Sequence, residues 1–408
     1  MRARAAVPEV PSVSVLLPAW NAEATIGRAL ASVLDESGVD LECVVVDDAS
    51  TDGTLEVVRG IAAMDSRVVV LALEENGGVS NARNRGLELV RGEWLTLLDA
   101  DDRFLPGGLD ALRRATTDRS ALAVVGQQVW SDGRRTWLAD MYDIPDIRLA
   151  GRTSLVRRPG LVYFVSLHAK LFHRSTWAGL TFEGRVLGDQ PWVIRALLRA
   201  GERIEVVAET VYEWRRPAAG EAGSITTTSR ASAHGGVARA VALEHALRNV
   251  LEELERELPD PLARQVVAAR YVERLLRSDL GVHLSMVLAR RDPTTDELVA
   301  AVERFVGGVP NDLLTASSAL ATDILEPPLR HWNRLPGATR LAYWSLLDAA
   351  LRADPDVPNR ATTALSRATL RLVARRRPGR ALMVLASILL MLAGTPSLGR
   401  RAIRRLRS

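Results

Sequence analysis

The sequence predicts an α/β domain with a mostly parallel sheet, followed by an all-helical C-terminal part. In the N-terminal half, short β-rich apolar runs alternate with segments of helical periodicity. The apolar runs contain few polar residues, which is typical of strands covered by helices on both faces. After about Pro217 the chain becomes rich in Gly, Ser, Thr and Ala, and amphipathic helical stretches follow. A length of 408 residues also favours more than one domain.

The individual elements follow from these patterns. In the N-terminal half we expect strands at 12–18, 41–47, 67–73, 93–99 and 121–127, and helices at 24–35, 54–64, 79–90 and 106–116. In the C-terminal half we expect helices at 237–258, 262–288, 295–305 and 340–352. The expected domains are an N-terminal domain over 1–230, a helical domain over 231–356 and a basic tail over 357–408.

Polar clusters stand at the ends of three predicted strands, in the sequences PAWN, DDAS and DADD. Ligands bind at the carboxyl ends of parallel strands, so we expect these clusters to converge on one site. One acidic strand end alone would be explained equally well by a turn or a helix cap. Hard oxygen ligands favour Mg²⁺ or Mn²⁺, and Asp99 and Asp101 are the expected ligands of a metal bound to a diphosphate.

Three longer segments occur in a characteristic order, namely VSVLLPAWNAEATIGRALASVL, VVVDDASTDGT and NGGVSNARNRGLELVRGEWLTLLDADD. In this order they resemble the nucleotide-binding half of the family 2 inverting glycosyltransferases, over about 12–227 of the chain. The resemblance implies an A-type glycosyltransferase fold, which is Rossmann-like. It also implies a metal-assisted single displacement that moves a hexosyl or N-acetylhexosaminyl group from a nucleotide-sugar donor to a hydroxyl.

The resemblance implies which residues bind the donor. Trp20 lies where the family more often has tyrosine or phenylalanine to frame the base, and it keeps a stacking face. The pair Asp47 and Asp48 matches the family's base and ribose contacts. A carboxylate accepts the imide N–H of uracil, so a UDP-sugar is expected, with guanosine and cytidine donors left open. The full set of implied donor contacts is Pro18, Trp20, Asn21, Asp47, Asp48, Asn76, Gly77, Arg83, Asn84, Asp99, Ala100, Asp101, Arg215, Arg216 and Ser224.

The segment GRVLGDQPWVIRALLRAG resembles the part of the family that carries the catalytic base. The matching residue is Asp189, which follows Gly188 where the family often has a second acidic residue. A base in this position takes the proton of the acceptor hydroxyl, although Asp189 would also suit a helix N-cap. Gln190 and Trp192 are expected on the acceptor side of the site.

Lys170 is also expected on the acceptor side. It is the one lysine among 53 basic residues. A compact ammonium fits where a planar guanidinium does not, although the survival of one lysine by chance explains it equally well. His168 and His173 lie nearby, and we expect them to pack because their spacing matches no metal site.

Other classes of protein fit the sequence less well. A dinucleotide-dependent oxidoreductase needs G-x-G-x-x-G after its first strand, where this chain has PAWNAE. A processive polysaccharide synthase needs spans of about 20 apolar residues, and none occurs. A donor-binding scaffold without catalysis is retained as the alternative.

The helical half resembles the linker region of wall teichoic acid glycosyltransferases, which implies a polysaccharide, polyol-phosphate or lipid-linked acceptor. The sequence leaves open whether the protein is a homo-oligomer.

The compartment and the tail give two further expectations. One cysteine, Cys43, and an N-terminus without a signal-peptide pattern predict a cytoplasmic protein. The tail over 357–408 has 12 arginines and no acidic residue. Its apolar run at 381–393 would form a helix of roughly 20 Å, too short for a bilayer core of about 30 Å. Basic flanks favour peripheral binding to anionic lipid on the inner face of the cell membrane over a core helix. Nucleic acid is not expected as a partner, because the tail has no aromatic residue.

Overall fold

The computed structural model describes residues 11–117, 120–132, 136–138, 144–184, 187–215, 233–281, 284 and 295–315. The predictions for Arg216, Ser224, the helix at 340–352 and the tail lie outside these residues. The chain divides into two compact units, and each is described by itself. The first comprises Met1–Ala222 and Ala246–Val267, and the second comprises Gly223–His245 and Ala268–Ser408.

One part of the sheet in the first unit is parallel and regular. Its strands lie in the order β3-β2-β1-β4, and every pairing among them is parallel. All seven positions of β1 and of β2 are buried, as expected for apolar strands covered on both faces. The elements are β1 Val13–Ala19, α1 Ile26–Leu34, β2 Leu41–Asp47, α2 Thr54–Met64, β3 Val68–Ala72, α3 Val79–Leu87 and β4 Trp94–Leu97. The predicted strands and helices of this region are therefore confirmed.

The sheet continues through β9, β6, β10 and β5, and here it is mixed. Strand β9 lies between β4 and β6 and is antiparallel to both, whereas β6 and β10 are parallel. The sheet is therefore mostly parallel, as expected, and its second part contains antiparallel strands such as β9, which was not predicted. The elements are β5 Arg103–Phe104, β6 Ala123–Ser131, β7 Thr136–Leu138, β8 Gly151–Thr153, β9 Lys170–His173 and β10 Ile204–Arg215.

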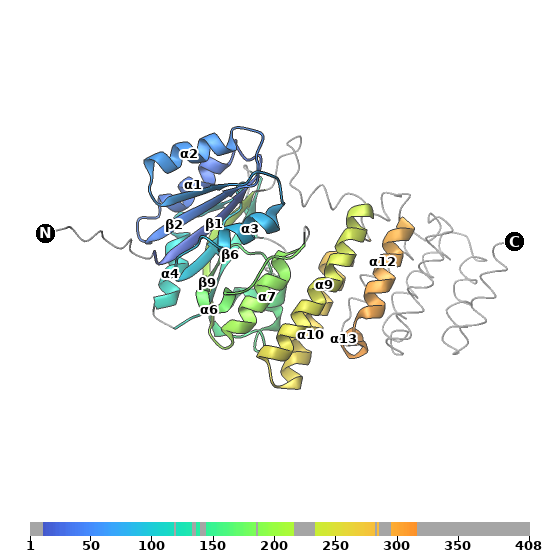
Figure 1. Ribbon diagram of the computed structural model, residues 1–408. Coiled ribbons are helices and arrows are strands. Elements are labelled where there is room, and N and C mark those ends of the chain that lie inside the picture. The colour runs from blue at the N-terminus through green and yellow to red at the C-terminus, as the bar shows by residue number, and fades with distance from the viewer. Residues whose placement is uncertain are drawn as a thin grey trace, which may run out of the picture. The chain divides into compact units, whose positions relative to one another are not determined.

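Helices pack closely against the sheet (Figure 1). Helix α3 packs on β1 and β2, and α4 packs on β10 and β6. A Cβ at Gly86 of α3 would lie 2.2 Å from Leu16 Cδ1, and one at Gly108 of α4 would lie 2.5 Å from the Val211 carbonyl oxygen. Only glycine permits these approaches. The further helices of this region are α4 Gly108–Thr117, α5 Pro145–Arg148, the 3₁₀ helix Pro159–Tyr163, α6 Arg174–Trp177 and α7 Asp189–Ala200.

The chain after β10 is helical, as predicted. The described elements are α9 Ala233–Glu257, α10 Pro261–Arg274, the π-helix Leu275–Gly281, α12 Thr295–Gly308 and α13 Asn311–Thr315. In the first unit, Glu253 of α9 accepts hydrogen bonds from Arg195 and Arg199 of α7 at 3.0 and 2.8 Å. In the second unit, buried Asp279 pairs with Arg239 and Arg274. Among the described residues, every helix is too short or too polar to cross a membrane.

Candidate active site

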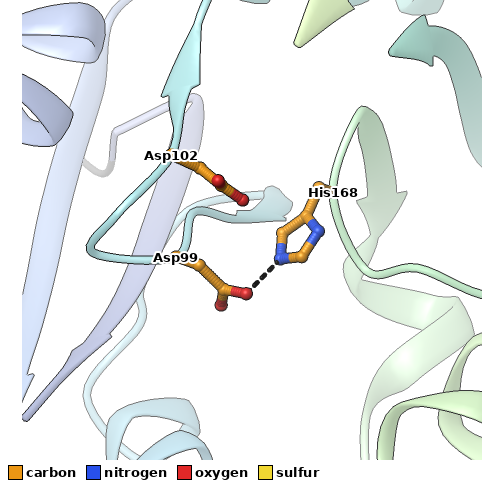
Figure 2. Close-up of side chains that lie close together, drawn as sticks. All are labelled: Asp99, Asp102 and His168. Atoms are coloured by element: carbon orange, nitrogen blue, oxygen red, sulfur yellow. Dashed lines mark ion pairs between the residues drawn. The ribbon is translucent and has the colours of Figure 1, made fainter. Parts of the chain in front are cut away.

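The polar cluster after β4 lies at the centre of the site. Asp99 Oδ1 accepts a hydrogen bond from Arg83 Nη2 of α3 at 3.2 Å, and Asp99 Oδ2 lies 2.9 Å from His168 Nε2 (Figure 2). Burial alone would raise the pKa of Asp99, but His168 and Arg83 hold it well below its usual range. Asp99 is therefore an ionised carboxylate between two cationic or hydrogen-bonding partners.

The next two carboxyl groups carry negative charge that their neighbours compensate less fully. Burial and repulsion by Asp99 raise the pKa of Asp101. Burial, together with Asp101 and Asp99, raises the pKa of Asp102 well above its usual range. Asp102 has no exposed surface, and its two oxygens accept hydrogen bonds from Tyr212 Oη at 2.9 Å and from the Arg215 backbone N–H at 2.8 Å. A bound cation would relieve this repulsion.

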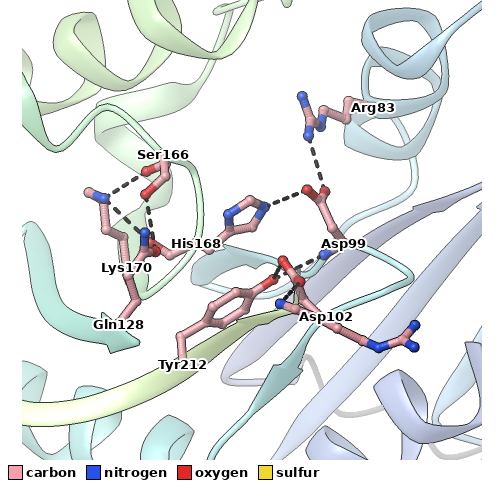
Figure 3. Close-up of polar contacts among 9 residues, drawn as sticks. Arg83, Asp99, Asp102, Gln128, Ser166, His168, Lys170 and Tyr212 are labelled. Atoms are coloured by element: carbon pink, nitrogen blue, oxygen red, sulfur yellow. Dashed lines mark hydrogen bonds and ion pairs between the residues drawn. The ribbon is translucent and has the colours of Figure 1, made fainter. Parts of the chain in front are cut away.

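His168 completes a group that the sequence did not predict. Its ring stacks on Tyr212 with the centroids 4.9 Å apart and the planes at 12° (Figure 3). Donor atoms of Asp99, Asp102 and His168 all lie within 4.8 Å of one another, which suits a metal ion. The expectation that His168 only packs is therefore wrong. Asp101 as a metal ligand stays a prediction, since Asp102 takes its place in this group.

The end of β2 supplies a second polar cluster. Asp48 Oδ1 and Oδ2 accept hydrogen bonds from the backbone N–H groups of Gly77 and Gly78 at 2.9 and 2.8 Å. The Asn76 amide donates to the Asp48 carbonyl oxygen at 3.1 Å, so this loop is tied to the strand end. Asp47 is 1% exposed, and its Oδ1 has no hydrogen-bond partner among the described residues. An N–H group of a ligand would satisfy this buried oxygen.

Four other predicted donor contacts have definite positions. Trp20 is 48% exposed, so its ring is accessible for stacking. Asn21 has a positive φ of 48°, and its Oδ1 accepts a hydrogen bond from the Thr51 backbone N–H at 2.8 Å. Pro18 is buried in β1 opposite Val46. The side chain of Asn84 both donates to and accepts from the backbone of Phe182, at 2.9 and 2.8 Å, so it joins α3 to the segment before α7. That structural role was not predicted for Asn84.

The acceptor-side predictions require two corrections. Lys170 is fully buried, its Nζ donates to the carbonyl oxygens of Ser166 and His168 at 2.6 and 3.3 Å, and it lies over the Phe164 ring (Figure 3). Burial lowers the pKa of Lys170 well below its usual range, although the carboxylate of Asp189 opposes this effect. Trp192 has no exposed surface and packs against Phe172 and Phe182, because it lies on the sheet-facing side of α7. Lys170 and Trp192 therefore do not line an open acceptor site.

Asp189 is the first residue of α7 and is half-buried. The N-cap is Gly188, so the structure does not support Asp189 as the capping residue. The Asp189 carboxylate accepts a hydrogen bond from the Gln190 backbone N–H at 3.1 Å, and Gln190 is buried. A negative charge in the first helical turn is stabilised by the helix dipole. The carboxylate also lies close enough to Lys170 to influence its pKa.

Comparisons with known proteins agree with this geometry. Staphylococcus aureus TarS 1–349, solved in complex with UDP-GlcNAc, superposes with a TM-score of 0.65 over 85% of this chain and 92% of that chain. At 20% identity, this likeness shows a shared fold. The succinoglycan biosynthesis protein ExoO of Rhizobium meliloti is 34% identical over 212 residues, which cover 50% of this chain and 57% of ExoO. A putative teichuronic acid biosynthesis glycosyltransferase of Bacillus subtilis, TuaG, is 39% identical over 110 residues, covering 27% of this chain and 44% of TuaG. The chain thus spans about half the length of ExoO and of TuaG.

The N-terminal region therefore has an A-type glycosyltransferase fold. Residues 14–177 match the family model described as "Glycosyl transferase family 2". The N-terminal part of the chain is therefore a family 2 glycosyltransferase domain, as its motifs predicted.

Proposed function

We propose that the protein transfers a sugar from a nucleoside diphosphate sugar to a hydroxyl of a cell-envelope acceptor, with inversion at the anomeric carbon. The observation that carries this proposal is the convergence of three carboxylate groups on one edge of the sheet. Asp47 is the last residue of β2, Asp99 follows β4, and Asp189 begins α7 close to Lys170 of β9. They suit, respectively, contact with the base, stabilisation of the leaving diphosphate and activation of the acceptor.

A uridine donor fits the base side of the site best. The unpartnered Asp47 Oδ1 can accept the imide N–H of uracil, and the exposed ring of Trp20 offers a stacking face beside it in the sheet. Asn76 and Gly77 donate hydrogen bonds to Asp48 and so hold their loop beside it. The guanidinium of Arg83 donates a hydrogen bond to Asp99. Arg83 Nε is buried without a hydrogen-bond partner among the described residues, so a donor oxygen would satisfy it.

The carboxylates and His168 fit a divalent cation. Asp99 and Asp102 offer oxygen ligands, and His168 adds a nitrogen, which suits a transition metal such as Mn²⁺ better than Mg²⁺. When bound, such an ion would neutralise charge that develops on the leaving diphosphate. Asp101 lies next to this group, where its carboxylate is repelled by Asp99 and would gain from the same ion.

Asp189 is the proposed general base. In a single displacement one group must take the proton of the attacking hydroxyl, and the half-buried carboxylate of Asp189 at the start of α7 is the group proposed for this role. The acceptor class follows from the relatives, whose names assign them to succinoglycan and teichuronic acid biosynthesis. Lipid-linked acceptors and peripheral binding to the inner membrane face through the tail are part of the proposal.

Release of nucleoside diphosphate from UDP-, GDP- and CDP-sugars, with Mn²⁺, with Mg²⁺ or with chelator, tests the proposal. We expect turnover with UDP-sugars that requires the metal. Asp189→Asn should reduce transfer by about 10²- to 10⁴-fold while UDP binding is retained. Asp110→Asn is the matched control, since Asp110 pairs with Arg114 on the outer face of α4. Donor binding without turnover in the unmodified chain would favour the non-catalytic scaffold instead, and full activity of Asp189→Asn would remove Asp189 as the base.

A further inference from the structure

Two stacked tryptophans at the carboxyl ends of β6 and β10 have no role in the site described so far. The rings of Trp130 and Trp214 lie 4.0 Å apart with their planes at 24°, and both side chains are half-buried. The two residues are register partners in the parallel β6–β10 pair. Trp137 of β7 is the register partner of Trp130 on the other side. Three of the nine tryptophans of the chain therefore occupy one row across three neighbouring strands.

This pair continues the polar site along the same face of the sheet. Trp214 lies two residues after Tyr212, and their register partners, Trp130 and Gln128, have the same separation. Side chains two residues apart on a strand point to the same face, so the pair lies about 7 Å beyond Tyr212 along β10. Tyr212 carries the stacked ring of His168, which contacts Asp99. The tryptophans thus extend a row that begins at the proposed metal group.

The opposite face of the sheet is already occupied at this point. Val211, which alternates with Tyr212, points to the face covered by α4, because a Cβ at Gly126 of β6 would lie 2.6 Å from Val211 Cγ2 and 3.0 Å from Leu112 Cδ2 of α4. Trp214 therefore lies on the face that carries the site. The Arg215 backbone N–H also ties this strand end to Asp102 at 2.8 Å.

The order of the strands separates the tryptophans from the nucleotide. Trp20 and Asp47, the proposed base contacts, belong to the ends of β1 and β2, whereas Trp130 and Trp214 belong to β6 and β10. Strand β4, which leads to Asp99, lies between the two groups in the sheet. In a single displacement the acceptor attacks opposite the leaving diphosphate. A ligand on the tryptophans would therefore lie on the acceptor's side.

We propose that Trp130 and Trp214 form an acceptor subsite that stacks a pyranose ring. This inference rests on the proposed function and narrows its acceptor to a saccharide chain. A pyranose ring presents a flat face of C–H groups, and a rigid indole covers such a face with little loss of conformational freedom. A polyol phosphate has no such face.

The test measures binding of cellobiose, chitobiose and glycerol 3-phosphate to the full chain by saturation-transfer NMR. We expect both disaccharides to bind through ring C–H protons. Trp130→Ala and Trp214→Ala should each raise their dissociation constants about tenfold, whereas Trp130→Phe and Trp214→Phe, which keep an aromatic face, should stay within about threefold. The same titrations with UDP should be unchanged in these variants. Glycerol 3-phosphate should show no tryptophan-dependent binding.

Trp20→Ala is the matched control, because it removes an accessible indole on the nucleotide side. It should weaken UDP binding and leave disaccharide binding unchanged. Disaccharide affinities unaffected in Trp130→Ala and Trp214→Ala would overturn the subsite, as would tryptophan-dependent binding of glycerol 3-phosphate or no disaccharide binding at all. Failure of the proposed function would instead show as absence of UDP-sugar binding and turnover in the unmodified chain.

Discussion

The environment of buried carboxylates differs between the two ends of the parallel strands. We call the end where these strands begin the amino edge of the sheet and the end where they finish the carboxyl edge. At the amino edge, Glu42 of β2 accepts hydrogen bonds from Ser14 Oγ at 2.6 Å and from the Arg91 backbone N–H and Nε at 2.6 and 2.8 Å. Burial alone would raise the pKa of Glu42, but these partners lower it. At the carboxyl edge, burial and mutual repulsion raise the pKa values of Asp101 and Asp102.

The difference separates a structural acid from a functional one. The neighbours of Glu42 compensate its charge completely, so the ion is part of the folded structure and needs no ligand. Among the aspartates after β4, Asp99 pairs with His168 and Arg83, whereas burial and repulsion within the cluster disfavour the charged forms of Asp101 and Asp102. Under the proposed function, a bound cation would favour these charged forms. Burial alone therefore does not identify an active-site carboxylate; at the carboxyl edge it is joined by repulsion within a cluster of aspartates.

The largest effect expected from a residue outside the proposed ligands is at Lys170. This side chain holds the carbonyl groups of Ser166 and His168, and thereby the segment that presents His168 to Asp99. A guanidinium is larger than an ammonium, and this site has no exposed surface, so Lys170→Arg should overpack it by about 1–3 kcal/mol. We expect kcat to fall tenfold or more with little change in the KM for donor.

Arg85→Lys is the control for an exchange of the same two residue types at the surface, since Arg85 is 49% exposed and pairs only with Glu88 among the described residues. It should change stability by less than about 0.5 kcal/mol. Lys170→Met tests whether the ammonium itself is needed, because methionine fits the volume but leaves both carbonyl groups without their donor. Full turnover by Lys170→Arg would show that this segment tolerates displacement and that His168 is not held by Lys170.

A smaller effect is expected at Tyr212, which supports the carboxyl edge from β10. Its hydroxyl donates to Asp102 and accepts the Asp99 backbone N–H at 3.3 Å. Tyr212→Phe removes a donor that stabilises the ionised form of Asp102, so we expect an Mn²⁺ requirement about tenfold higher and a loss of about 1 kcal/mol in unfolding free energy. Activity measured against Mn²⁺ concentration gives the first quantity, and urea unfolding gives the second.

Tyr271→Phe provides the comparison, since Tyr271 is equally buried but belongs to α10. It is expected to change stability without changing the metal dependence. An unchanged Mn²⁺ requirement in Tyr212→Phe would mean that Asp102 does not contribute to metal binding, and the two edges would then differ less than their pKa shifts indicate.

The regular part of the sheet could be predicted from sequence, and the mixed part could not. Strands β1 and β2 are continuous apolar runs that alternate with helices, so local periodicity is enough to find them. Strand β9 has four residues and owes its position to long-range antiparallel pairing with β4 and β6. No local pattern predicts such a strand, and the sequence prediction therefore did not contain β9.

The same contrast explains which site residues were found. Asp47 and Asp99 are the last residues of two predicted strands, so the strand-end rule predicted them at the site. His168 comes from the segment before β9, and Tyr212 from the late strand β10, and both meet Asp99 only after the sheet has assembled. Trp192 was placed at the acceptor because it lies near Asp189 in sequence, but three residues along α7 the side chain faces the core.

The smallest predicted effect lies at the amino edge and concerns stability alone. Glu42→Gln should lower the free energy of unfolding by about 1 kcal/mol at pH 7, because the amide keeps an acceptor oxygen for Ser14 and the Arg91 backbone N–H but loses the ion pair and the hydrogen bond from Arg91 Nε. The pKa of Glu42 is lower in the folded state than in the unfolded chain, where it is about 4.3. Its contribution is therefore complete above the unfolded pKa and is lost as the pH falls through the folded pKa. Urea unfolding at pH 7, 5 and 3 should show the difference between the two proteins shrinking toward zero at the lowest pH, while donor turnover at pH 7 stays unchanged. A constant difference across this range, or a loss of turnover, would show that the amino edge is not the purely structural partner of the carboxyl edge.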